Sequence, residues 1–252
     1  HFNIPDPSLD STRQMFKDLE NDARDTKIDL GIGIYRDEKG EAPVFKAVKK
    51  AESILYQNEK SKSYKTPVGN SEYCKNILDL VLGEDILSER KDKVGAIQIP
   101  GAGSGLRIAG ELIKNNVQNK LISIPDPTWG QQPFMFEKAG LKISKHIYYN
   151  EQNNFLDFDN MVNDLNKLKS GDSLLLHGCC HNPTGADLSL EQWEQVANIC
   201  LKKGILPFID LVYQGLGKSI IDDVLGIRKL VQIVPEVIIT VSSSKTFGVY
   251  RD

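Results

Sequence analysis

The sequence predicts an α/β fold, a mostly parallel sheet sandwiched by helices, with a small domain beside it. Short apolar runs alternate with stretches of helical periodicity along most of the 252 residues, as in strands joined by crossover helices. The composition, 40% hydrophobic and 26% charged, is that of a folded chain. Because the pattern changes near residue 43, we expect an N-terminal arm and part of the small domain in residues 1–42. We expect the large domain in residues 43–252.

Each element is predicted from its own pattern. Apolar runs between turn residues predict strands over residues 27–34, 94–99, 121–124, 143–149, 173–177, 206–210 and 237–241. Apolar residues at helical spacing predict helices over residues 8–24, 105–116, 190–203 and 221–234. The helix over 190–203 has the clearest ends, because Ser189 and Gln192 form a capping-box pattern and Gly204 follows the last turn.

Charge, hydropathy and cysteine content exclude several classes of protein. Lys and Arg total 31 against 34 Asp and Glu, so the net charge of -3 gives no overall attraction to nucleic acid or to a membrane surface. No apolar run reaches the roughly eighteen residues that a membrane span needs. Four cysteines are too few for a disulfide scaffold, so we expect a reducing compartment: the cytoplasm, with the mitochondrion as the alternative.

His177 and His181 are the closest histidine pair, at a spacing that would suggest zinc on a helix. The run before them reads as a buried strand, in which residues four apart lie about 13 Å from each other. The strand interpretation offers no further ligand nearby, so we expect no metal site.

Small residues and hydroxyl groups follow two of the predicted strands and suit a phosphate. The turn Pro100-Gly-Ala-Gly-Ser-Gly105 precedes a helix, whose first backbone N–H groups bind anions. Leu106 stands where the dinucleotide pattern needs its third glycine, and such a turn also occurs for packing alone. After the last strand, three serines come directly before Lys245.

Polar residues after the other strands complete the pattern. Asn182 lies in an Asn-Pro turn, and Asp210 closes a strand with Tyr213 close behind it. Each has an ordinary structural alternative: a loop turn, a loop cap or, for Lys245, a surface lysine. Together, at the carboxyl ends of parallel strands, they match pyridoxal phosphate. Its phosphate needs donors, its ring nitrogen needs a carboxylate and its aldehyde needs a lysine amine.

The sequence resembles the class I pyridoxal-phosphate aminotransferases, a fold type I family, and within it the aspartate aminotransferase branch. The resemblance runs through nearly all 252 residues. It is carried by Lys27-Ile-Asp-Leu-Gly-Ile-Gly33-Ile-Tyr35, Leu106-Arg107, Pro127-Thr128-Trp129, His177-Gly-Cys-Cys-His-Asn182-Pro-Thr-Gly185, Asp210-Leu-Val-Tyr213-Gln-Gly215 and Ser242-Ser-Ser-Lys245-Thr-Phe-Gly248.

The resemblance implies a role for each of these regions. Lys245 would form a Schiff base with the cofactor and later move the substrate Cα proton, while Asp210, supported by His177, would hold the ring-nitrogen proton. The other implied cofactor contacts are Tyr213 and Asn182 at the ring oxygen, Trp129 stacked on the ring, Ser242, Ser244, Ala102, Gly103 and Ser104 at the phosphate, and Tyr64 reaching the phosphate of the other subunit. Ile32 and Gly33, with Trp129 and Asn182, would contact substrate. These roles imply a homodimer with shared active sites.

The implied reaction is reversible amino transfer between an amino acid and a 2-oxo acid, with L-aspartate and 2-oxoglutarate as the expected pair. Three residues depart from the family pattern. Gly103 stands for threonine, although Ser104 can supply a hydroxyl. Gln132 stands for histidine, which we expect to weaken the support of Asp210, and Val212 stands for alanine under the ring. The arginines for phosphate and for substrate carboxylates would fall past residue 252, so we expect this chain, which looks C-terminally incomplete, to be inactive alone.

Three other functions stay open from the sequence. An aromatic aminotransferase of the same fold would form the same lysine adduct. An NAD-dependent oxidoreductase that uses the glycine-rich turn would not form it. A binding protein that kept the fold without catalysis would bind neither cofactor, although Asn182, Asp210, Tyr213 and Lys245 are all present.

Overall fold

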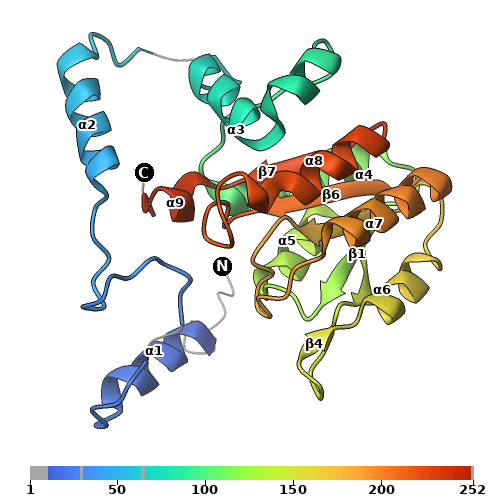
Figure 1. Cartoon of the computed structure of the whole chain (residues 1–252), viewed down its shortest axis with the longest axis horizontal. Helices are drawn as coiled ribbons and strands as arrows, with labels where there is room; N and C mark the ends of the chain where they lie inside the picture. The colour runs from blue at the N-terminus through green and yellow to red at the C-terminus, as the bar shows by residue number, and fades with distance from the viewer. Residues whose placement is uncertain (1–10, 29–30, 64–65, 251–252) are drawn as a thin grey trace, which may run out of the picture.

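The computed structural model describes residues 11–28, 31–63 and 66–250, with side chains from residue 14 onward. A central sheet lies between helices, and α1 and α2 lie to one side of it (Figure 1). The helices are α1 (Ser11–Asn21), α2 (Lys46–Asn58), α3 (Ser71–Glu89), α4 (Gly101–Asn116), α5 (Gln131–Ala139), α6 (Phe158–Leu165), α7 (Leu190–Lys203), η2 (Asp222–Val224), α8 (Leu225–Ile233) and α9 (Ser243–Thr246). The strands are β1 (Leu121–Asp126), β2 (Lys142–Ile147), β3 (Tyr149–Asn150), β4 (Phe155–Leu156), β5 (Ser173–His177), β6 (Leu206–Leu211) and β7 (Ile238–Val241).

The main sheet is five-stranded, in the order β2-β1-β5-β6-β7, and its pairings are all parallel. The order runs outward from β1 to β2 in one direction and from β5 to β7 in the other, so it reverses between β1 and β5. The carboxyl ends of strands beside such a reversal are where ligands of open α/β sheets bind. The prediction of a mostly parallel sheet with helices is confirmed.

Both faces of the sheet are buried, because side chains alternate along the central strands. Leu174 and Leu176 of β5 belong to the core that α6, α7 and α8 cover. Leu175 between them and Phe208 of β6 belong to a second core, which α4 and α5 cover. This burial on both faces explains why the central strands read as continuous apolar runs in the sequence.

The helix α7 has the bounds and the ends that its sequence predicts. Ser189 Oγ accepts from the N–H of Gln192 at 3.3 Å, and Gln192 Oε1 accepts from the N–H of Ser189 at 2.8 Å. Gly204 follows the last turn with a left-handed φ of 66°. The expected capping box and glycine stop are therefore both present.

Two predicted strands are absent from the described part of the chain. Residues 94–99 have no regular secondary structure and belong to no sheet; the N–H of Gln98 donates instead to Val68 O, at 2.9 Å. Residues 27–28 and 31–34 form no strand either, and Ile28 is 80% exposed. An apolar run becomes a strand only where a neighbour supplies the other half of the hydrogen bonds, and neither run has one here. Residues 29 and 30 lie outside the described part.

Other predicted elements keep their type and change their bounds. The first helix begins at Ser11 in the described residues, with residues 8–10 lying outside them, and ends at Asn21. The helix α4 begins at Gly101, so the glycine-rich turn is its own first turn. The strand predicted over 143–149 ends at Ile147, and the helix predicted over 221–234 starts as the 3₁₀ turn η2 before α8. None of the described helices is long and apolar enough to cross a membrane.

Candidate active site

Three polar residues lie side by side at the carboxyl end of the sheet. The register pairs His177 of β5 with Asp210 of β6, and Asp210 with Thr240 of β7. In-register neighbours on parallel strands point to the same face. Phe208, two residues before Asp210, lies in the core under α4 and α5, so all three side chains face these helices.

Asp210 is the most buried charged group of this row, at 5% exposure. Gln132 Nε2 donates to its Oδ2 at 2.7 Å, and Thr240 Oγ1 donates to its Oδ1 at 3.2 Å. Burial raises the pKa of Asp210 to about 6, against the lowering effects of these two hydrogen bonds and of the Lys245 charge. A buried carboxyl group with a perturbed pKa and a specific cationic neighbour is typical of functional sites.

Gln132 connects Asp210 to His177. It lies on α5, fully buried, and its Oε1 is 3.0 Å from His177 Nε2 and accepts from the Thr128 hydroxyl. Burial lowers the pKa of His177 to about 4, so the imidazole is neutral at physiological pH. The support of Asp210 that the resemblance implies for His177 is therefore indirect and passes through Gln132.

Lys245 lies in the short helix α9, directly after β7. Ser242 begins that helix, and its Oγ accepts from the N–H of Ser244 at 3.4 Å. Burial lowers the pKa of Lys245, and the Asp210 carboxylate opposes this shift. A lysine whose amine loses its proton more easily is a better nucleophile toward a carbonyl group.

Asn182, Tyr213 and Gly33 come together although they are far apart in the sequence. The Asn182 side chain hydrogen-bonds Tyr213, which opposes the rise that burial gives to the pKa of Tyr213. A Cβ added to Gly33 would lie 2.6 Å from the Tyr213 hydroxyl oxygen, so only glycine fits there. The expected substrate loop thus touches the site through Gly33, while Ile32 is 47% exposed.

The first turn of α4 lies over the end of β7. A Cβ on Gly105 would lie 3.1 Å from Thr240 Cγ2, which shows how closely the helix passes the strand. Pro100 makes no side-chain cap, so no side chain takes up the first backbone N–H groups, those of the turn that holds Ala102, Gly103 and Ser104. A Cβ on Gly103 would meet Met135 Cε at 3.1 Å, a tight contact that a threonine there would create.

Trp129 follows β1 and is partly buried against the core under α4 and α5. Its carbonyl accepts from the N–H of Gln132 at 2.9 Å, at the start of α5. The aromatic ring expected to stack on the cofactor therefore belongs to the segment that also carries Gln132. Tyr64 lies outside the described residues.

His181 lies much closer to His177 than the strand spacing predicts. The two rings stack with centroids 4.5 Å apart, because β5 ends at His177 and the chain turns back through Cys180, which has a φ of 47°. Asp187 holds this turn by accepting from the N–H groups of Cys180 and His181, at 2.8 and 2.9 Å. Among the described residues, no group of His, Cys, Asp and Glu side chains is arranged to hold a metal ion.

Sequence reasoning missed three contacts of the row. It did not identify Thr240, although the strand register would place that residue beside Asp210. It named Gln132 only as a departure, and it gave Thr128 no role. Thr128 lies in the turn before α5, a helix that the sequence analysis did not predict, so no local pattern marked its contact with Gln132.

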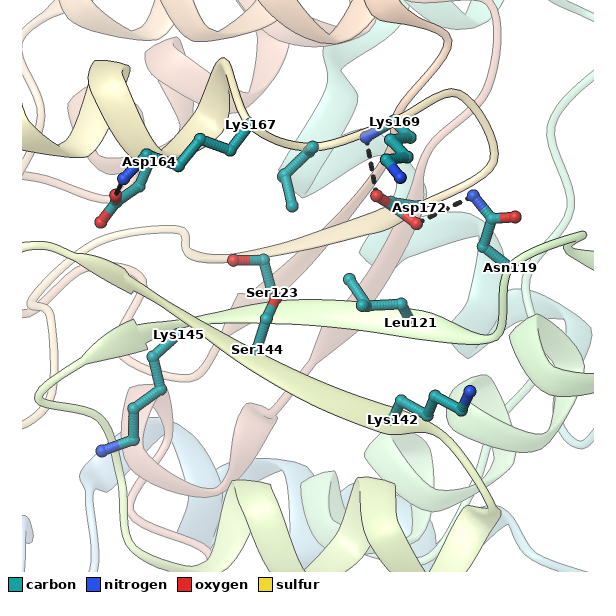
Figure 2. Close-up of a pocket in the computed structure, with 11 residues that line it drawn as sticks. Asn119, Leu121, Ser123, Lys142, Ser144, Lys145, Asp164, Lys167, Lys169 and Asp172 are labelled. Atoms are coloured by element: carbon teal, nitrogen blue, oxygen red, sulfur yellow. Dashed lines mark hydrogen bonds and ion pairs between the residues drawn. The ribbon is translucent and has the colours of Figure 1, made fainter.

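A hollow with a volume of about 500 Å³ lies over β1 and β2, away from this row (Figure 2). Its charged groups are largely paired: Lys167 contacts Asp164 at 2.6 Å, and Asp172 accepts from the N–H of Lys169 at 2.7 Å. The side chains of Lys142 and Lys145 extend away from Ser123 and Ser144 at its centre (Figure 2). These charges do not converge on a ligand, so the carboxyl-end site remains the candidate active site.

Comparison with known proteins agrees with this placement. Residues 25–252 match the family described as aminotransferase class I and II. The aspartate aminotransferase of Escherichia coli (strain K12) is 38% identical over 231 residues, and the tyrosine aminotransferase of Rhizobium meliloti (strain 1021) is 40% identical over 234 residues. These matches cover 92% and 93% of this chain, which spans only 58% and 59% of those relatives.

A solved structure agrees as well. The aromatic-amino-acid aminotransferase of Burkholderia pseudomallei, covalently bound to pyridoxal phosphate, superimposes with a TM-score of 0.89 at 31% identity. The superposition covers 99% of this chain and 62% of that one. The row of polar residues at the carboxyl end of the sheet, the strand order and the length of the match all indicate the same family. The chain therefore belongs to the class I and II aminotransferase family, in the branch of the aspartate aminotransferases.

Proposed function

We propose that this protein is an aspartate aminotransferase, which carries pyridoxal 5'-phosphate on Lys245 and moves an amino group reversibly between L-aspartate and 2-oxoglutarate. One observation carries the proposal: Lys245 and the buried Asp210 interact at the carboxyl end of the sheet, and burial lowers the pKa of the lysine. The relative with covalently bound pyridoxal phosphate supports the choice of cofactor.

The residues at this edge fit the cofactor. Asp210 offers a carboxylate to a protonated ring nitrogen, and Asn182 and Tyr213, already hydrogen-bonded to each other, offer donors to the ring oxygen. The hydroxyls of Ser242 and Ser244 and the uncapped first turn of α4, residues 102–104, suit a phosphate. Bound there, the cofactor would supply an electron sink for a carbanion at the substrate Cα.

The side chains divide the work of the reaction among themselves. Asp210 would hold the proton on the ring nitrogen, because it offers a buried carboxylate at this edge of the sheet. Lys245 Nζ would hold the cofactor through its amine and would move the proton at the substrate Cα. Trp129, Ile32 and Gly33 would lie on the substrate side of the site.

An aromatic amino acid is the second candidate substrate. The observation that favours it is the similarity to relatives named for tyrosine and for aromatic amino acids, which is as high as that to the aspartate enzyme. The assay that separates the two compares kcat/KM for aspartate, tyrosine and phenylalanine with 2-oxoglutarate. A clear preference for aspartate supports the proposal, and a preference for tyrosine replaces it.

The test of the cofactor and lysine is chemical. The longest expressible form of the protein is incubated with pyridoxal phosphate, reduced with borohydride and mapped by peptide mass. We expect one adduct, at Lys245, that is lost in Lys245→Ala and kept in Lys218→Ala, an exposed lysine of the loop after β6. No adduct, or one spread over several surface lysines, would overturn the proposal.

We also propose a homodimer in the cytoplasm, in which Tyr64 of each chain reaches the other site. The surface of α2 supports the dimer: the helix has no buried residue, and Ile54, Leu55 and Tyr56 are 48%, 63% and 90% exposed. Adjacent exposed apolar side chains on one element are typical of interfaces.

Four free cysteines support a reducing compartment. We also propose that residues 1–42 form an N-terminal arm and part of a small domain, and that residues 43–252 form the large domain.

The dimer is tested by sedimentation velocity. We expect a dimer for the unaltered protein and a monomer for Leu55→Lys, because a charge in the centre of the interface would lose its hydration there. The control is Lys49→Glu, which changes charge on the same helix and leaves the apolar side chains in place. A monomer before any substitution would refute the dimer.

A further inference from the structure

Gln132 is the closest hydrogen-bond donor to Asp210. Its Nε2 lies 2.7 Å from Asp210 Oδ2, against 3.2 Å for Thr240 Oγ1 on the other carboxylate oxygen. Both donors are neutral. The titratable groups around the carboxylate are His177, its in-register neighbour on β5, Lys245 on α9 and Tyr213 after β6. Gln132 itself is 0% exposed, so solvent does not compete for its amide.

The orientation of the Gln132 amide follows from its other contacts. His177 Nδ1 accepts from the backbone N–H of Asn182 at 3.1 Å, and a backbone N–H can only donate. A neutral imidazole that accepts at Nδ1 carries its proton at Nε2. That proton points to Gln132 Oε1, 3.0 Å away, and the Thr128 hydroxyl donates to the same oxygen. Two donors at Oε1 leave the NH₂ group facing Asp210.

The same contacts keep this arrangement in one protonation state. A second proton on His177 would have to sit at Nδ1, against the N–H of Asn182. Burial already lowers the pKa of His177 to about 4. Gln132 does not titrate at all, whereas a free histidine changes charge at about pH 6.5. The donor to Asp210 therefore keeps its charge state over the range in which an imidazole donor would change charge, and only Asp210 itself, with a pKa of about 6, titrates there.

We propose that Gln132 is a positioning residue: the His177 tautomer and the Thr128 hydroxyl orient its amide, and the amide holds Asp210 as an accepting carboxylate. The expectation that glutamine weakens the support of Asp210 is thereby replaced, because the amide is long enough to reach the carboxylate and keeps its donor at every pH. The inference rests on the proposed function only in the role that Asp210 has toward the cofactor.

The test uses the cofactor-free 252-residue chain and NMR titration of selectively labelled aspartate and histidine. In Gln132→Met, which keeps the length of the side chain without its donor, we expect the pKa of Asp210 to rise by about one to two units, the value of one hydrogen bond to a charged group. The matched control is Gln131→Met, the exposed neighbour on the same helix, with no shift. An unchanged pKa of Asp210 in Gln132→Met would overturn the proposal.

Gln132→His is the second variant and keeps the test decisive if Gln132→Met does not fold. We expect it to add a second inflection to the Asp210 titration near the pKa of the new imidazole; a single inflection, as with glutamine, would also overturn the proposal. In the unaltered chain, His177 must carry its proton on Nε2 alone. A proton on Nδ1 at neutral pH would remove the reason for the amide orientation.

These measurements separate the inference from the proposed function. The NMR titration needs no cofactor, so it stands if no adduct forms at Lys245. Where the adduct does form, the absorbance of the bound cofactor gives a second readout: its titration midpoint should move in Gln132→Met and not in Gln131→Met. If Gln132→Met forms the adduct normally and changes neither the titration midpoint of the cofactor nor the pKa of Asp210, the proposed aminotransferase function would stand. The proposed role of Gln132 would then be wrong.

Discussion

The sheet region and the N-terminal region of this chain use their apolar residues differently. In the central strands β1, β5 and β6 most side chains are buried on one face of the sheet or the other. Among the described residues 14–28 and 31–63, none is buried, and α2 places Leu55 and Tyr56 in solvent at 63% and 90% exposure. The sheet region is stabilised by its own packing. The N-terminal region exposes apolar side chains, as expected for a surface that binds a partner.

The polar groups differ in the same way. In the sheet region several polar groups are buried and hydrogen-bonded to one another, such as His177, Gln132 and Asp210. In the N-terminal region the charged pairs lie at the surface, where ion pairs add little to stability. Perturbed pKa values at buried groups therefore occur in the sheet region, and the stability of the molecule should depend on pH through that region.

The largest expected effect is loss of stability in acid. Burial lowers the pKa values of His177, His146 and His181 to about 4, 3 and 2, below the unfolded value of about 6.5. Their stabilising contribution is complete above pH 6.5 and falls as the pH drops through that value toward the folded pKa values. Each histidine costs about 2 kcal/mol between pH 7 and pH 5.

Asp210 acts in the opposite direction, because its raised pKa of about 6 lets the folded state take up a proton first as the pH falls. The net loss is on the order of 5 kcal/mol. Urea unfolding at pH 7 and pH 5 measures it, and His146→Leu should reduce the difference by about 2 kcal/mol. Equal stability at the two pH values would show that these histidines are not held neutral.

The next effect compares the loss of stability when one aromatic side chain in each region is replaced by alanine. Phe208 is fully buried and meets Phe136 edge to face, with ring centroids 5.6 Å apart. Phe208→Ala should lower the free energy of unfolding by about 4 kcal/mol, since it removes the contacts and leaves a cavity. Tyr56→Ala, at 90% exposure, should change it by less than about 0.5 kcal/mol. Both are measured on the same chain by denaturant titration; a loss at Tyr56 as large as that at Phe208 would contradict the comparison.

The same division decides what the sequence could predict. Strands β5 to β7 and the helix α7 were predictable, because burial and capping leave patterns in consecutive residues. Residues 94–99 carry the same apolar pattern but have no partner strand, and pairing is a property of distant residues. The site shows the same limit: the residue types Asp210 and Lys245 were visible, but the contact of Gln132 with Asp210 depends on how α5 packs over β6.

The smallest of these effects concerns the contact between α7 and α8. A Cβ on Gly226 would lie 2.2 Å from Trp193 Cδ1, and Trp193 is itself buried at 4% exposure. The indole cannot move away without displacing its own neighbours, so Gly226→Ala should cost about 2 kcal/mol by overpacking, despite the higher helix propensity of alanine.

Gly130 is the matched control, because nothing lies within 4 Å of its added Cβ and its φ of -57° suits any residue. Gly130→Ala should therefore be neutral or slightly stabilising. Thermal unfolding of the two variants side by side gives the comparison, and equal stabilities would mean that Trp193 has room to yield. In that case the α7–α8 contact would be as adaptable as the exposed surface of α2. The packing difference between the sheet region and the N-terminal region would then be supported by the strands alone.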